Sequence, residues 1–160
     1  MTQVTTKLAA GTKFSIASGN PATKDAAGYA ALEWKQAKKV NSISEKGKQR
    51  EREEDQYLED TAPTVSKGVE RHDDVTIDLN FSKGDAGQAL AQDAVDSDDE
   101  YHFRYEYSNG DVEYHTGPVL GMRRKSMTAQ GKLGFVLTHA CNPITKADGS
   151  QTTSIYVEAV

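Results

Sequence analysis

Hydrophobic and polar positions alternate most regularly in the segment DVTIDLNF, residues Asp74–Phe81. Its apolar side chains share one side of an extended chain: Val75, Ile77, Leu79 and Phe81. Successive side chains of a strand point to opposite faces, so a period of two is typical of a strand with one buried face. The pattern predicts a strand that covers a hydrophobic core.

The same period recurs more weakly elsewhere. Phe14 and Ile16 predict a short strand over Lys13–Ser18, and Leu133, Phe135 and Leu137 predict another over Lys132–Cys141. Val40 and Ile43 indicate a strand in AKKVNSIS at the edge of a core. The pattern also favours a strand over residues 118–127 and either a strand or a tail over residues 154–160.

A hairpin is predicted over residues 101–117, YHFRYEYSNGDVEYHTG. Asn-Gly between two alternating arms is the strongest short signal for a two-residue turn, because both central residues of that turn need positive φ. A two-residue loop at Asn109-Gly110 sets Tyr107 opposite Val112 and Tyr105 opposite Tyr114.

One helix is predicted between these strands, in SKGDAGQALAQDAVDSDDE. Ala86, Ala89, Leu90 and Val95 recur at nearly helical spacing, and Asp85 stands near the start, where an acid favours the helix dipole. The apolar stripe is narrow, so we expect a small helix over one face or end of a sheet.

The segment 45–74 follows neither period. Its first part, EKGKQREREED, is almost entirely charged. Ion pairs four residues apart would support a helix there by only about 0.2–0.5 kcal/mol each. Structureless loops of roughly this length are uncommon in compact domains and are usually functional or disordered. We therefore predict a long charged loop.

The predicted elements and the composition fit a single domain over residues 1–160. With 36% hydrophobic residues the chain can form one core. The expected class is mainly β: a β-sandwich or partly rolled barrel of about six to eight antiparallel strands with one flanking α-helix and the long charged loop. Residues 1–13 are expected to form an N-terminal arm, and 146–160 a C-terminal tail.

Charge and cysteine usage exclude several classes. The net charge of -5 argues against a protein that grips nucleic acid, which is normally basic. No apolar run reaches the roughly eighteen residues of a membrane span, and the N-terminus resembles no signal peptide. The single cysteine, Cys141, rules out an internal disulfide framework and favours a reducing compartment.

The sequence predicts no catalytic, metal or cofactor site, and hence no enzyme. His72, His102, His115 and His139 match no metal-ligand spacing. In the predicted register His115 lies opposite Arg104 with His102 on the same polar face, so we interpret both as solvent-facing. Cys141 has His139 two residues away but no third group to orient the pair, and is interpreted as a passive thiol.

Together the order of the pieces resembles a known family. A strand ending KKVNSIS is followed by the charged segment with DQYLEDTA, the strand DVTIDLNF, the helix KGDAGQALAQDAV, the hairpin YHFRYEYSNGDVEYHTGPVLGM and the strand KLGFVLTHACNPI. This order resembles the tail tube (major tail) protein of long, non-contractile-tailed bacteriophages of the lambda type. The resemblance covers roughly residues 40–144.

Membership would imply a β-sandwich with a flanking helix, whose hexameric rings stack into the hollow tube through which DNA passes without specific binding. It would imply a virion protein assembled in the host cytoplasm, with tape measure and tail tip or terminator proteins as partners. Some members carry a further immunoglobulin-like domain; none is expected here, since the sequence stops at Val160.

The resemblance suggests what the charges do. We expect the loop to be mobile in the monomer and to become ordered against another copy, because its ordering entropy is offset only by a partner's contacts. The expected interface residues are Lys46, Lys48, Arg50, Arg52, Glu53, Glu54, Asp55, Tyr57, Leu58, Arg123, Arg124 and Lys125. The acids expected to face the lumen and repel DNA are Asp96, Asp98, Asp99, Glu100, Asp111 and Glu113.

Two alternatives remain open at this point. One is the tube protein of a related secretion or contractile system, which shares the fold. The other is a monomeric β-sandwich binding module, perhaps for carbohydrate, that would use an exposed face of Tyr105, Tyr107 and Tyr114.

Overall fold

The computed structural model describes residues 6–160 as strands, short helices and connecting loops. Within this range the two helices are α1 (Ala26–Ala30) and α2 (Ala86–Asp96). The strands are β1 (Lys13–Ala17), β2 (Lys35–Ala37), β3 (Val40–Ile43), β4 (Lys48–Asp55), β5 (Thr64–His72), β6 (Val75–Asn80), β7 (Tyr101–Glu106), β8 (Val112–Gly117), β9 (Val119–Arg124), β10 (Gly134–His139), β11 (Ile144–Thr145), β12 (Gln151–Thr152) and β13 (Ile155–Val157).

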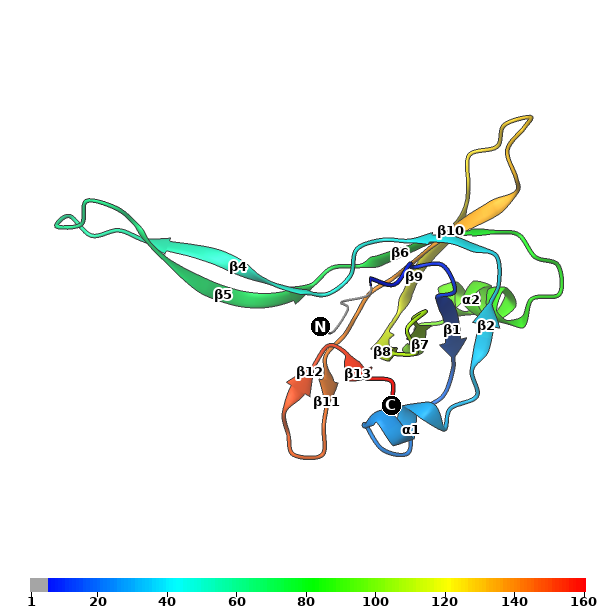
Figure 1. Cartoon of the computed structure of the whole chain (residues 1–160), viewed down its shortest axis with the longest axis horizontal. Helices are drawn as coiled ribbons and strands as arrows, with labels where there is room; N and C mark the ends of the chain where they lie inside the picture. The colour runs from blue at the N-terminus through cyan, green and yellow to red at the C-terminus, as the bar shows by residue number, and fades with distance from the viewer. Residues whose placement is uncertain (1–5) are drawn as a thin grey trace, which may run out of the picture.

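Two antiparallel sheets form the body of the molecule. One has the order β13-β8-β7-β1-β2 and the other β3-β6-β10-β9, while β4-β5 and β11-β12 are separate two-stranded sheets. Figure 1 shows β4 and β5 extending far from this body. The predicted mainly-β, sandwich-like class is confirmed, with additional short strands in segments that the sequence left as loop or tail.

The core lies between the two sheets. Strand β6 behaves as its alternation predicts: Val75, Ile77 and Leu79 are fully buried, whereas Phe81, just beyond the strand, is half exposed. Facing it, β1 and β7 supply a second set of apolar side chains to the same cluster, notably Phe14, Ile16, Phe103 and Tyr105. Burial of these side chains drives the two sheets together.

Helix α2 forms where expected but buries a different face. Asp85 is its N-cap and accepts hydrogen bonds from the backbone of Gly87 and Gln88. The buried residues are Gly87, Gln88, Ala91 and Ala94. Of the predicted stripe only Leu90 packs against the core, and the other members are exposed. The small residues let α2 approach β2 closely: a Cβ on Gly87 would lie 2.5 Å from the carbonyl oxygen of Gln36. Shape therefore sets the contact at Gly87, while Ala91 and Ala94 belong to the hydrophobic core.

The β7–β8 hairpin has a register one residue away from the predicted one. Its loop holds three residues, Ser108 to Gly110, and only Gly110 has positive φ. Glu106 consequently pairs with Val112, and Phe103 pairs with His115. A one-residue shift moves every side chain of a strand to the other face, so His115 points into the core instead of lying on a polar face opposite Arg104.

The predicted strand over residues 37–44 divides into two strands that belong to different sheets. Strand β2 pairs with β1, and β3 pairs with β6 in the opposite sheet. Between them Lys39 adopts φ 63, an unusual conformation for a residue with a side chain. This corner carries the chain from one layer of the sandwich to the other.

The C-terminal segment is also more regular than expected. Strand β11 pairs with β12, and β13 adds to the edge of the larger sheet beside β8. Tyr29 and Trp34, near α1, pack with Tyr114 in a second cluster that includes Ile144. Neither helix within residues 6–160 has the length and apolarity needed to cross a membrane.

Candidate assembly surfaces

The segment predicted as a loop is a long β-hairpin. Strand β4 pairs with β5 from Lys48–His72 at the base to Asp55–Thr64 near the tip, with one irregularity between Arg50 and Arg52. The prediction of an irregular loop is therefore wrong in form. Polar cross-strand pairing replaces the hydrophobic alternation on which the sequence reasoning depended.

The hairpin has almost no buried side chains. Along β4 only Glu51 is partly buried. The exposed Arg50 still contacts the facing strand, because its Nε donates to the carbonyl of Gly68 at 3.0 Å. Several of its charges are used within the hairpin, in the ion pairs Arg52–Glu54, Arg71–Glu51 and Lys48–Glu70. Exposed pairs of this kind contribute little to stability. A two-stranded hairpin of such composition is marginal in water.

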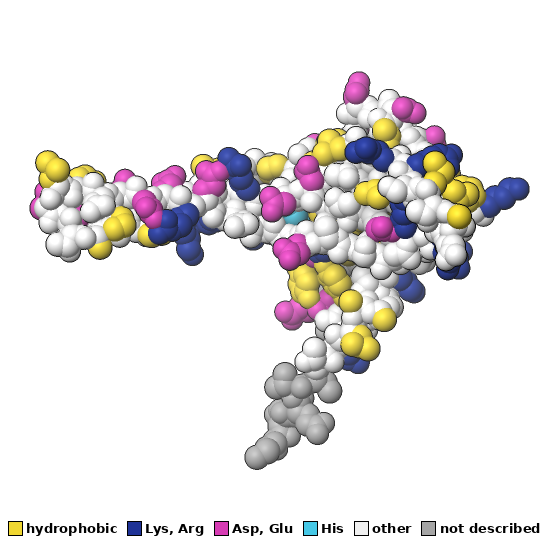
Figure 2. Space-filling model, turned by 90° about the horizontal axis from the view of Figure 1, so that it is seen from above, with side chains coloured by type: hydrophobic (Ala, Val, Ile, Leu, Met, Phe, Trp, Pro, Cys, Tyr) yellow, Lys and Arg dark blue, Asp and Glu magenta, His cyan; other side chains and the backbone are white. Residues whose placement is uncertain are grey.

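The outer half of the hairpin is acidic and has an apolar tip. Residues 53–66 contain no Lys or Arg, and their acids are Glu53, Glu54, Asp55, Glu59 and Asp60. Tyr57 and Leu58 at the tip are strongly exposed. Figure 2 shows apolar atoms at this tip, acidic side chains along the hairpin with Lys and Arg side chains on its inner part, and further Lys and Arg side chains at the opposite end of the body.

Two residues assigned to surfaces by the sequence meet inside the molecule at the hairpin base. Lys46 forms an ion pair with Glu113, and both side chains are almost inaccessible. Tyr107 also donates to this carboxylate. Lys46 Nζ lies 4.7 Å from the ring centre of Tyr105 and 4.9 Å from that of Tyr107. Lys46 as an interface residue and Glu113 as a lumen acid are therefore corrected: both are internal.

Burial and neighbouring groups act in opposite directions on the pKa of the Glu113 carboxyl. Burial raises the pKa of the carboxyl, but contacts with His115, Lys46 and Tyr107 outweigh burial and hold it well below its ordinary value. Burial and the same carboxylate raise the pKa of Tyr107. The carboxylate is thus charged and matched by Lys46, which fixes the start of the hairpin to the sheet.

The basic patch at the end of β9 is partly engaged within the chain. Lys125 binds Asp78 and, at 3.1 Å, Asn80. The contact between Lys125 and Asp78 lowers the pKa of the Asp78 carboxyl. Arg124 lies over the Phe135 ring at 5.4 Å, and Arg123 and Arg124 are exposed. Of the three predicted residues, these two arginines are the ones that face solvent.

The other acids predicted to face the lumen differ in whether their carboxylates are hydrogen-bonded within the chain. Asp96, Asp98, Asp99 and Glu100 are all exposed around the end of α2. Asp111 instead accepts hydrogen bonds from Tyr156, Asn109 and the backbone of Ala159, and the bond from Tyr156 lowers its pKa. Only the first group forms a surface cluster on a connecting segment.

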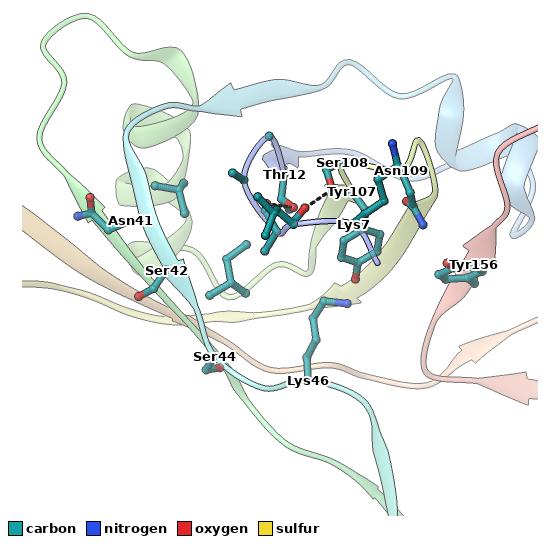
Figure 3. Close-up of a pocket in the computed structure, with 16 residues that line it drawn as sticks. Lys7, Thr12, Asn41, Ser42, Ser44, Lys46, Tyr107, Ser108, Asn109 and Tyr156 are labelled. Atoms are coloured by element: carbon teal, nitrogen blue, oxygen red, sulfur yellow. Dashed lines mark hydrogen bonds between the residues drawn. The ribbon is translucent and has the colours of Figure 1, made fainter. Parts of the chain in front are cut away.

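A groove that sequence reasoning missed lies beside the N-terminal arm. Residues 7–12, strand β3, the 107–109 turn and Tyr156 line a volume of about 800 Å³. Figure 3 shows Lys46 pointing from its floor towards Tyr107, and the arm held by Ser108 donating to the carbonyl of Leu8. Lys7 and Lys46 are the charged residues of its lining, and Lys46 is already paired with Glu113. The sequence gives no signal for this groove, because its lining joins segments far apart in the chain.

The histidine and tyrosine interpretations also change. His102 and His115 are buried instead of solvent-facing, and His139 is buried as well. His139 shares a hydrogen bond of 2.6 Å with the hydroxyl of Tyr105, and Tyr114 is buried on the other face of the sheet. Tyr105, Tyr107 and Tyr114 therefore form no exposed platform, and the binding-module alternative loses its basis. Burial raises the pKa of the Cys141 thiol to about 12, far from that of an activated nucleophile.

Comparisons with known proteins place this geometry in a structural context. No protein-family model matches the sequence, and a search of curated proteins gave no match. A chain of the six-fold symmetrised baseplate of the anti-feeding prophage (AFP) matches with a TM-score of 0.59 and 6% identity, covering 98% of each chain. A type six secretion system protein matches with a TM-score of 0.50 and 10% identity, covering 89% of this chain and 91% of that one. At these identities the likeness shows a shared fold, and that fold occurs in phage-tail-related machinery.

Proposed function

We propose that this chain is a structural subunit of a phage-tail-like tube, in which hexameric rings stack to form a hollow channel for DNA. The observation that carries the proposal is the hairpin β4–β5, which projects from a well-packed body without a core of its own (Figure 1). The fold shared with a six-fold symmetrised baseplate chain supports the ring.

Charge separation along the molecule supports contact between unlike surfaces of neighbouring copies. The hairpin tip carries acids and two exposed apolar side chains, Tyr57 and Leu58, while Arg123 and Arg124 are exposed on the body. A surface that binds a different surface of the next copy builds rings or filaments instead of a closed dimer. Opposite charges favour this pairing and suppress tip-to-tip contact.

The channel is proposed to be lined by the exposed acids at the end of α2, namely Asp96, Asp98, Asp99 and Glu100. Negative side chains repel the phosphate backbone, and without Lys and Arg contacts little would hold the DNA in the channel. Asp111 is a weaker candidate because its carboxylate is held by Tyr156 and Ala159. Tape measure and tail tip or terminator proteins are the expected partners, in a virion assembled in the host cytoplasm.

Charge reversal tests the proposed contact. One variant carries Glu53→Lys, Glu54→Lys and Asp55→Lys at the tip, and the other Arg123→Glu and Arg124→Glu on the body. Each alone should fail to form the rings or rods that wild type forms in negative-stain microscopy and light scattering of concentrated protein. Mixed in equal amounts they should assemble. The positive tip of the first variant then meets the negative body of the second, and the negative tip of the second meets the positive body of the first. Amide exchange in the hairpin should slow on assembly.

Two results would contradict the proposal. Wild type could remain monomeric at every concentration and salt, or both reversed variants could assemble like wild type. The second candidate function is a tube protein of a secretion or contractile system, supported by the fold of the type six secretion system protein. Mass spectrometry separates the two: the chain is found in purified phage particles in one case, and in a secreted fraction from phage-free cells in the other.

A further inference from the structure

Three metal-ligating side chains from distant parts of the sequence meet where the hairpin joins the body. His72 ends β5, His115 lies in β8, and Cys141 follows β10. One ligand atom from each lies within 4.8 Å of the other two. His115 is fully buried, Cys141 is partly buried, and the His72 ring packs edge-on against His115 at 5.2 Å.

The two imidazole rings are oriented in the same way. Nδ1 of His72 lies 3.0 Å from the carbonyl oxygen of Asp73, and Nδ1 of His115 lies 3.2 Å from that of Thr153. A carbonyl oxygen only accepts, so each Nδ1 carries a proton, and in the neutral ring Nε2 then keeps its lone pair. Histidines that bind metals are held in this way, by a hydrogen bond from the other ring nitrogen to a carbonyl.

Both Nε2 atoms are buried and have no hydrogen-bond partner among residues 6–160. Leaving a buried polar atom unsatisfied costs about 1–3 kcal/mol, so two such atoms beside one thiol call for an explanation. A shared ligand satisfies both lone pairs at once.

Glu113 provides the charge balance. Its Oε2 holds Lys46 and Tyr107, while its Oε1 lies 3.2 Å from His115 Nε2. Oε1 is thus a candidate fourth donor. The carboxylate also offsets the positive charge of Lys46, the nearby cation that would otherwise oppose a dication.

We propose that His72 Nε2, His115 Nε2 and Cys141 Sγ bind one Zn²⁺ ion, with Glu113 Oε1 or a water in the fourth position. Two imidazoles and a thiolate suit a borderline cation of tetrahedral preference. Ligand atoms of a tetrahedral zinc site lie roughly 3.3–3.7 Å apart, given Zn–N and Zn–S bonds of about 2.1 and 2.3 Å. The side chains therefore need to move together by about 1 Å. On binding, the thiol releases its proton to solvent as the S–Zn bond forms.

Such an ion would tie the last residue of β5 to both sheets of the body, because β8 belongs to one sheet and β10 to the other. It would then fix the direction in which the hairpin leaves the body. Figure 2 shows a small area of histidine surface where the hairpin joins the body, and the His72 side chain is only partly buried. The metal site does not depend on the tube function proposed above.

Cobalt and zinc binding by the full chain test the site. Reduced wild type should take up one equivalent of Co²⁺, giving a thiolate-to-cobalt charge-transfer band and the visible bands of a tetrahedral ion, and Zn²⁺ should displace it. His72→Gln and Cys141→Ser should each weaken binding at least about 10- to 100-fold, since loss of a ligand costs no less than loss of its supporting hydrogen bond. His102→Gln is the matched control: His102 is also buried, but it binds Thr116 and Gly19 away from the site, so binding should stay at the wild-type level.

Failure of wild type to bind cobalt with a thiolate band overturns the proposal. So does wild-type affinity in His72→Gln, whose partly exposed side chain makes a folded variant a reasonable expectation even where Cys141→Ser fails to fold. An imidazolium at His115 paired with Glu113 is the competing arrangement. It would appear in nitrogen NMR as protons on both ring nitrogens, unchanged by added zinc, and would equally refute the site.

Discussion

The body and the hairpin of this protein are built on opposite principles. In β6 every second side chain is fully buried, and Val75, Ile77 and Leu79 face β1 and β7 across the core. In β5, a strand of greater length, Gly68 alone is buried. The body is therefore held by hydrophobic burial, whereas the hairpin has only its backbone ladder and exposed ion pairs.

The difference separates the contacts that stabilise the monomer from the surface that the proposed assembly would bury. Hydrophobic burial accounts for most of the stability of a small domain, so the body can fold without the hairpin. A hairpin with exposed Val65, Val69, Tyr57 and Leu58 presents apolar area with nothing to cover it within residues 6–160. Such area in a projecting element is expected to be covered by another copy. Changes in the two regions should then affect different measurements.

The largest contrast is expected from one substitution made in both regions. Leu79→Ala should reduce the free energy of unfolding by about 4 kcal/mol, because Leu79 is fully enclosed and the cavity cannot close. Leu58→Ala, at the fully exposed tip, should change it by less than about 0.5 kcal/mol. Denaturant unfolding of the monomer measures both.

Assembly should show the reverse order. Leu58→Ala should raise the concentration needed for rods in light scattering, while any folded Leu79→Ala protein should assemble as wild type does. Similar unfolding costs for the two variants would mean that the hairpin tip is packed in the monomer, and the division between body and hairpin would be wrong.

The second contrast concerns two lysines on either side of the hairpin base. Lys46→Met should cost about 3 kcal/mol, because it leaves the buried carboxylate of Glu113 without its cation. Lys48→Met should cost less than about 1 kcal/mol, since its contact with Glu70, at 3.9 Å, is exposed. Thermal and denaturant unfolding compare the two. The double variant Lys46→Met/Glu113→Gln should recover part of the loss; no recovery would mean that Lys46 acts through packing alone.

The body could be predicted from sequence because its signals are local. Alternation identified β1, β6 and β10, and Asp85 marked the start of α2, since period and capping depend on neighbouring residues. The face of α2 could not be predicted, because Gly87 is buried by its close contact with β2, which no hydrophobic spacing signals. Ala91 and Ala94 join the hydrophobic core on the same side of the helix. The predicted register of β7–β8 was wrong because the loop has one residue more than expected. The environment predicted for His115 was therefore wrong as well.

The surfaces were harder to predict for physical reasons. Strand pairing in β4–β5 is carried by backbone hydrogen bonds and charged cross-strand neighbours, which leave no hydrophobic period. The Lys46–Glu113 pair and the His72, His115 and Cys141 cluster join segments far apart in the chain. No spacing rule detects them, because their proximity exists only once the two sheets have packed.

The smallest contrast in unfolding free energy is expected from replacing two glycines by alanine, and here the sign of the change is what tests the packing. Alanine is favoured over glycine inside a helix by about 1 kcal/mol, yet Gly87→Ala should destabilise by about 2 kcal/mol. The new Cβ would stand 2.5 Å from backbone atoms of Gln36 and Ala37, which cannot move without separating α2 from β2.

In Gly68→Ala of the hairpin, the new Cβ would come about as close to its nearest neighbour, but that neighbour is a side chain instead of backbone. This Cβ would lie 2.6 Å from Oε1 of Glu53, the end of a flexible and exposed side chain that can turn away. Alanine also reduces the entropy of the unfolded chain, so the unfolding free energy should change by less than about 0.5 kcal/mol. The same unfolding experiment compares the two variants. A stabilising Gly87→Ala would show that α2 is loosely seated and that tight packing does not extend to the helix, whereas a costly Gly68→Ala would show that the hairpin is as rigidly packed as the body.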